Sequence, residues 1–154
     1  MWKIADFSIT QEGTSRTPLI TTSSRGTASY RAPELLTDSP IYTNKVDIWA
    51  LGCIAFEIFT GRKRFGSDWE VQNLAQSMPS ISKLIPIEAD VENSMIKLIE
   101  AMLRVDWTAR ADGYEVVDRM IDIAPFLLKS TRLPKQWKRC ESCYHIWNER
   151  VHSQ

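Results

Sequence analysis

The stretch "TNKVDIWALGCIAFEIFTG" at residues 43–61 decides how the rest of the chain can fold. Wound as a helix, it is apolar on nearly every face, whereas a surface helix has a single apolar stripe. Thr43 or Asn44 is suited to cap its start, and Gly61 is suited to end it. The run is too short to cross a membrane and is interrupted by acidic residues. We therefore expect a buried central helix against which other elements pack.

Two later segments also have helical patterns. Residues 67–76 are expected to form a short helix. In residues 90–106 the apolar side chains recur with the helical period, and Asp90 is placed to cap the start. The apolar positions of that period are Val91, Met95, Leu98, Ile99 and Met102. This pattern predicts an amphipathic helix with one face on the core.

The last helix is predicted over residues 111–124. Asp112 and Glu115 stand at the spacing of a capping box, with Asp in place of the usual Ser or Thr. Pro125 is expected to end this helix. Beyond it, residues 125–154 are basic and irregular, and we interpret them as a tail.

The N-terminal part is less regular. Residues 2–5 are expected to form a short strand, and residues 8–25 are rich in Ser and Thr, which is typical of a loop. A short helix is expected over residues 33–38, opening at Pro33, because proline suits the first turn of a helix. The predicted fold class is therefore mainly α, with a long loop in front of a helical bundle.

Composition narrows the function classes. The chain has 154 residues, which suits one domain, with 19 basic and 19 acidic side chains and a net charge of zero. Without a strong overall charge, neither nucleic acid nor an anionic membrane is favoured as a partner. The first residues include Lys3 and Asp6, so no secretory leader is expected there. The three cysteines favour free thiols and an intracellular setting, cytoplasm or nucleus.

The tail contains a second kind of signal. Cys140 and Cys143 form a Cys-x-x-Cys pair followed by His145, which leaves a zinc module open as a remote alternative. A second ligand pair at the usual spacing is missing, so a tail with free thiols is favoured. The short basic clusters at residues 62–64 and 135–139 are more typical of solvated turns than of a nucleic-acid surface.

Four stretches, taken in order, resemble signatures of the eukaryotic protein kinase family, serine/threonine type. They are "KIADFS" (3–8), "GTASYRAPELL" (26–36), "VDIWALGCIAFEIFTG" (46–61) and "LRVDWTARADGYEVV" (103–117). "DFS" stands where the family has Asp-Phe-Gly, and "APE" matches Ala-Pro-Glu. The resemblance covers roughly residues 2–124 and implies the helical larger, C-terminal lobe of a kinase domain. Residues 6–34 would be its activation segment and residues 35–124 its helical core.

The resemblance also implies roles for single residues. Asp6 would hold Mg²⁺ on the phosphates of ATP, and Phe7 would pack beneath the cleft. Ser8 replaces the family's glycine and is expected to restrict this turn, because serine adopts a positive φ poorly. Thr27 and Tyr30 would face the protein substrate.

Three more expectations concern regulation and support. Thr22 or Ser23 best matches the regulatory phosphorylation site, although Ser and Thr are also common in any loop. Asp47, at the start of the central helix, would hold the catalytic loop by hydrogen bonds. The simpler reading is that Asp47 only favours the helix N-terminus.

Glu34 raises a specific question, because it lies beside Pro33 and two leucines, where a buried carboxylate needs a partner. The resemblance names Arg110 as that partner. The guanidinium of arginine can bind a carboxylate through two parallel hydrogen bonds. The alternative is that Glu34 only stabilises a helix start.

Several family signatures are not found in the 154 residues: the Gly-rich loop, the strand lysine and its partner glutamate, and the His-Arg-Asp catalytic loop. No catalytic base is therefore assigned. We expect part of a serine/threonine kinase domain that uses ATP and Mg in a complete parent and is inactive alone, with a protein substrate and the smaller lobe as partners. The alternative is a non-catalytic kinase-like interaction module.

Overall fold

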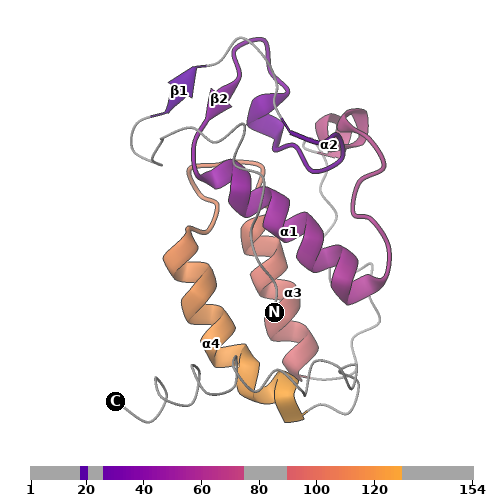
Figure 1. Cartoon of the computed structure of the whole chain (residues 1–154), viewed down its shortest axis with the longest axis vertical. Coiled ribbons are helices and arrows are strands. Elements are labelled where there is room, and N and C mark those ends of the chain that lie inside the picture. The colour runs from indigo at the N-terminus through magenta and orange to yellow at the C-terminus, as the bar shows by residue number, and fades with distance from the viewer. Residues whose placement is uncertain (1–17, 21–25, 75–89, 130–154) are drawn as a thin grey trace.

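Four α-helices and one two-stranded sheet make up the part of the chain that the computed structural model describes, residues 18–20, 26–74 and 90–129 (Figure 1). In chain order the elements are β1 (Leu19–Ile20), the 3₁₀ helix η1 (Pro33–Leu35), β2 (Ile41–Tyr42), α1 (Lys45–Thr60), α2 (Asp68–Leu74), α3 (Asp90–Met102) and α4 (Gly113–Lys129). The mainly helical fold class is confirmed for these residues.

The boundaries of α1 follow from its sequence. At the start, the Thr43 hydroxyl oxygen accepts a hydrogen bond from the Lys45 N–H at 3.1 Å, whereas the side chain of Asn44 makes no capping bond. At the end, Gly61 adopts a left-handed φ of 72°, and its N–H donates to the Glu57 carbonyl at 2.8 Å. Glycine suits this position because it lacks the Cβ atom that penalises positive φ.

The core lies between α1 and α3, and α3 also contacts α4 (Figure 1). The Trp49 ring stacks on Phe65 with 5.5 Å between ring centroids. Burial raises the pKa of the Cys53 thiol to about 12, so the thiol stays protonated at neutral pH. The largest buried apolar side chains are Trp49, Phe65, Ile96, Leu98, Ile99, Met102, Leu103 and Val71. The helical period in residues 90–106 therefore places Leu98, Ile99 and Met102 in the core, as predicted.

The close approach of α1 to the end of α3 depends on Gly52. A Cβ atom at this position would lie 2.9 Å from Leu103 Cδ2 and 2.9 Å from Met102 Cβ, closer than carbon atoms can pack. We expect Gly52→Ala to lower the free energy of unfolding by roughly 1–3 kcal/mol, as overpacking of a core does. Chemical denaturation measures the change. Gly113→Ala is the matched control, since nothing lies within 4 Å of its added methyl group; equal effects of the two substitutions would contradict this explanation.

The prediction that α1 is buried on all sides is wrong for the described residues. Leu51, Ile54 and Ile58 are 44%, 44% and 63% exposed. They follow one another by three and four positions, so they share a face of the helix. That face is apolar and uncovered.

The loop prediction for residues 8–25 also needs correction, because Leu19–Ile20 forms β1 and pairs antiparallel with β2, Leu19 opposite Tyr42 and Ile20 opposite Ile41. A two-residue strand gives no alternation from which sequence could predict it. The predicted helix over residues 33–38 is a single 3₁₀ turn, and α2 begins at Asp68, one residue later than predicted.

The predicted stop at Pro125 is wrong, because α4 continues through Pro125 to Lys129. A proline inside a helix removes one hydrogen bond, and the residues after it, Phe126, Leu127 and Leu128, include two strong helix formers. The other end agrees with the capping prediction in part. The Asp112 carboxylate accepts from the Glu115 N–H at 2.9 Å, but the Glu115 side chain pairs with Arg119.

Candidate functional site

Glu34 and Arg110, separated by 76 positions in sequence, lie against each other in the interior. Arg110 Nη1 donates to Glu34 Oε1 at 2.6 Å, and Nη2 donates to Glu34 Oε2 at 2.8 Å. The side chain of Arg110 is 0% exposed and that of Glu34 is 5% exposed. This is the two-bond geometry in which a guanidinium matches a carboxylate best.

The backbone before η1 explains how Glu34 reaches this place. Ala32 is extended, with φ −72° and ψ 150°, and Pro33 occupies the first turn of η1. Proline restricts the preceding residue to extended geometry, so the chain is extended up to Ala32 and turns in the 3₁₀ helix that begins at Pro33. Glu34 and Leu35 are then both buried.

The remaining donors of Arg110 are also used. Nη1 donates to the Lys45 carbonyl at 2.8 Å, Nε to the Arg104 carbonyl at 2.9 Å, and Nη2 to the Val105 carbonyl at 3.4 Å. Together with the two bonds to Glu34, these give an acceptor to each of the five N–H groups of the guanidinium. The Lys45 ammonium in turn donates to the Arg110 carbonyl. A buried charge is tolerated when it is bonded this completely.

An open groove of about 430 Å³ runs between the loop before η1 and the start of α1. Asp47 lies at one side of it and is exposed. Atoms packed on one side of its carboxyl group remove part of its water, which raises the pKa of Asp47. Within the described ranges no residue forms a hydrogen bond with this carboxylate. The other lining residues are Gly26, Thr27, Tyr30, Arg31, Ala32, Leu35, Tyr42, Val46, Ala50 and Ile54.

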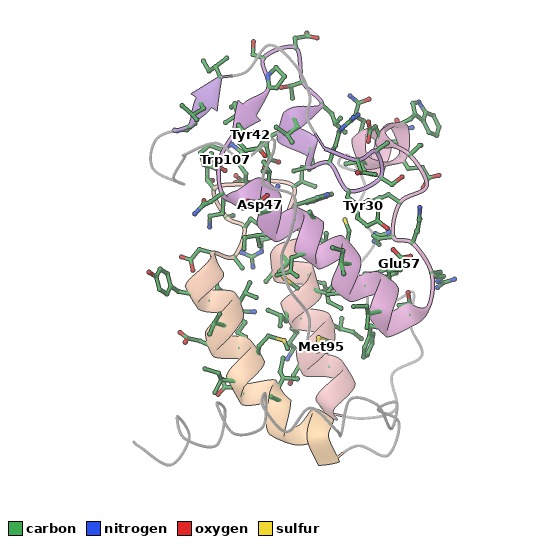
Figure 2. All side chains as sticks on the ribbon, in the orientation of Figure 1. Tyr30, Tyr42, Asp47, Glu57, Met95 and Trp107 are labelled. Atoms are coloured by element: carbon green, nitrogen blue, oxygen red, sulfur yellow. The ribbon has the colours of Figure 1, made fainter. Side chains whose placement is uncertain are left out.

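The two residues expected to face a substrate lie on the loop that borders this groove. Thr27 is exposed, and its carbonyl accepts from the Tyr30 N–H at 3.2 Å. The Tyr30 hydroxyl donates to Glu57 Oε2 at 2.6 Å. This hydrogen bond is the main cause of the raised pKa of Tyr30, and loss of water through burial is the second cause. Figure 2 shows Tyr30 near the C-terminal half of α1, which carries Glu57, with Asp47 at the other end of the helix.

Two acidic residues at this site were missed by the sequence analysis. Glu57 stands out in sequence only as a charge inside an apolar run, and it was used only as an argument against a membrane span. Asp68 binds Arg31 at 2.6 Å and has no sequence pattern that marks it.

Several predicted site residues lie outside the described residues, so their placement stays a prediction. These are Asp6, Phe7, Ser8, Thr22, Ser23, Cys140, Cys143 and His145. Within residues 18–20, 26–74 and 90–129, no group of three or more His, Cys, Asp or Glu side chains is placed to hold a metal ion. Among the same residues, no helix has the length and apolarity needed to span a membrane.

Comparison with known proteins gives a consistent result. Residues 1–120 match the model of the protein kinase domain family. The serine/threonine-protein kinase RUNKEL of Arabidopsis thaliana is 34% identical over 113 residues, which is 68% of this chain and 8% of that protein. The probable serine/threonine-protein kinase nek3 of Dictyostelium discoideum is 35% identical over 118 residues, 75% of this chain and 10% of that protein.

A shorter match is the serine/threonine-protein kinase ICK of Mus musculus, 43% identical over 72 residues, 47% of this chain and 11% of that protein. The aligned part of the chain thus spans about a tenth of the length of these relatives. The family model, however, covers most of the chain, and the chain belongs to the protein kinase family.

Proposed function

We propose that this chain supplies the activation segment and the helical larger lobe of a serine/threonine protein kinase domain. In a complete domain, the γ-phosphate of ATP would pass to a Ser or Thr hydroxyl of a protein substrate. The observation that carries the proposal is the buried, two-bond contact of Glu34 with Arg110, since these residues belong to two of the four kinase-like stretches. The partial domain would be residues 1–124, followed by a basic tail, in an intracellular setting.

The contact supports a role in positioning. Glu34 ends the activation segment. Arg110 lies between α3 and α4, and its guanidinium donates to the backbone carbonyls of Lys45, Arg104 and Val105. A rigid anchor at this point would limit where the substrate-facing loop can move. Kinase catalysis depends mainly on positioning and on charge stabilisation, so such an anchor serves the reaction without touching the phosphate.

The groove supports a docking role for Asp47. Its carboxylate lies at the edge of an apolar groove without a hydrogen-bond partner among the described residues, and its raised pKa reflects partial loss of water. Backbone N–H groups of a catalytic loop placed in the groove would give this carboxylate the donors that it lacks in the described part of the chain. Asp47 would then act through the catalytic loop and not on the substrate.

ATP and Mg²⁺ would be used only in the complete domain. The described residues contain no group of three or more His, Cys, Asp or Glu side chains placed to hold a metal ion. Asp6 is proposed as one ligand, because a carboxylate oxygen is the kind of ligand that Mg²⁺ prefers.

We expect the isolated 154-residue chain to transfer no phosphate. General base catalysis alone accounts for a factor of about 10²–10⁴, and neither a base nor the strand lysine is present in the sequence. The chain is incubated with labelled ATP, Mg²⁺ and a generic basic protein, and incorporation is compared with that of Asp6→Ala. Equal, background incorporation is the expected result. Incorporation that depends on Asp6 would show that the isolated chain is active and that this part of the proposal is wrong.

A second candidate function is a non-catalytic interaction module. The uncovered apolar face of α1, formed by Leu51, Ile54 and Ile58, favours it, because exposed apolar patches of this kind mark contact surfaces. The same face is equally suited to pack against the rest of a kinase domain. In-frame upstream sequence that encodes the strand lysine and the His-Arg-Asp loop would favour the kinase. Upstream sequence without them would favour the interaction module.

A further inference from the structure

The loop at residues 26–31 has a conformation that its own sequence does not favour. Ser29 has a φ of 74°, a left-handed value that is uncommon for any residue other than glycine. Residues held in this region cost free energy and persist only where surrounding contacts fix them. The contacts that fix Ser29 therefore determine the shape of the whole loop.

Those contacts come from the start of α2. Asp68 Oδ1 accepts from the Ser29 N–H at 3.1 Å, and Asp68 Oδ2 accepts from Arg31 Nη1 at 2.6 Å. The Ser29 hydroxyl donates to the Gly66 carbonyl at 2.9 Å. One carboxylate thus binds the loop at two residues, 29 and 31, that lie on either side of Tyr30.

The same loop is held from the opposite direction through Tyr30. Its hydroxyl is bound by Glu57 on α1, while both neighbours of Tyr30 are bound by Asp68 on α2. Arg31 Nε also donates to the Gly26 carbonyl at 2.9 Å, which closes the loop on itself. The loop is therefore fixed between two helices by its side chains and one backbone donor.

We propose that Asp68 is a positioning residue, through which α2 sets the conformation of the substrate-facing loop and so the place of Thr27 before a protein substrate. The inference rests on the proposed function for the identity of the substrate, but the positioning itself does not require kinase activity. Asp68 acts through Ser29 and Arg31 and has no assigned contact with substrate.

Amide hydrogen exchange of the full 154-residue chain, followed by NMR, tests this role. Asp68→Ala is expected to speed exchange at the Ser29 and Tyr30 amides by at least about tenfold, because a hydrogen bond to a charged acceptor is lost together with the ion pair. The Ser29 amide proton is also expected to move upfield, since it no longer bonds to a carboxylate. Exchange at Ile99, in the core of α3, should stay unchanged.

Two further variants sharpen the result. Arg31→Ala keeps the bond from Asp68 to the Ser29 N–H, so it should speed loop exchange less than Asp68→Ala and leave the Ser29 shift near its original value. If Asp68→Ala does not fold, Arg31→Ala takes its place as the test of the contact between Asp68 and the loop. Glu70→Gln is the matched control, because it removes a charge from the same helix. The Glu70 carboxylate accepts from the Gly66 N–H and makes no hydrogen bond to residues 26–31.

Unchanged exchange at Ser29 and Tyr30 in Asp68→Ala would overturn the proposal. An equal acceleration at Ile99 would also overturn it, since Asp68 would then only stabilise the fold. If the loop responds as expected while no kinase activity is found in a complete domain, the positioning role stands and the proposed function fails. The two ideas can therefore fail separately.

Discussion

Replacing Arg110 with alanine is expected to lower the free energy of unfolding by roughly 3–5 kcal/mol, because the buried Glu34 carboxylate would be left without its partner. The loss also frees the carbonyl oxygens of Lys45, Arg104 and Val105, all of which accept from this guanidinium. Chemical denaturation of the two proteins measures the difference. Arg110→Lys keeps the charge but cannot form the two parallel bonds, so most of the loss should remain.

The exposed pair of Glu115 and Arg119 is the control for this experiment. Their side chains are 44% and 41% exposed. Arg119→Ala should therefore cost less than about 1 kcal/mol, as surface ion pairs usually do. If Arg110→Ala costs no more than Arg119→Ala, the contact with Glu34 does not anchor the end of the activation segment. A double-mutant cycle with Glu34→Ala isolates the energy that belongs to the pair.

Trp49→Ala is expected to have the second large effect, a loss of roughly 3–5 kcal/mol, because it empties the space of a large buried aromatic ring. Trp49 is 1% exposed and stacks on Phe65. The Cζ atom of the Arg110 guanidinium lies over the Trp49 ring, 5.1 Å from its centroid. Removing the ring would thus weaken the core and the support of Arg110 together. Denaturation followed by circular dichroism measures the change.

Trp69, which is 70% exposed, is the matched control. Trp69→Ala should change stability by less than about 0.5 kcal/mol, as surface substitutions generally do. Similar losses for the two tryptophans would mean that the ring of Trp49 is not a main part of the core.

The sequence predicted the features that depend on local pattern. The apolar run at residues 43–61 is long and is bounded by Thr43 and Gly61, so its helix and both of its ends could be predicted. The pairing of Glu34 with Arg110 was expected from a family resemblance, since nothing local links two residues so far apart. The exposed face of α1 was not expected, because composition gives the apolarity of a helix and not what covers it.

The features that sequence did not predict depend on contacts between distant segments. Asp68 contacts Ser29 across 39 positions in sequence. The positive φ of Ser29 could not be predicted either, because serine rarely adopts such a value. The sequence analysis assigned no role to Lys45, yet its ammonium is buried against the Arg110 carbonyl. Pro125 misled the prediction because a proline usually ends a helix but can also lie inside one.

If this chain provides a working activation segment and larger lobe, it should complete a kinase domain from which these parts are missing. The smaller lobe and catalytic loop of one of the curated relatives are joined to residue 1, and transfer of labelled phosphate from ATP to Ser and Thr of a protein substrate is measured. The relative's own intact domain is the positive control, and Asp6→Ala in the joined protein is the negative one. We predict transfer that depends on Asp6. A joined protein that unfolds cooperatively, and therefore is folded, but transfers no more phosphate than Asp6→Ala would contradict the claim.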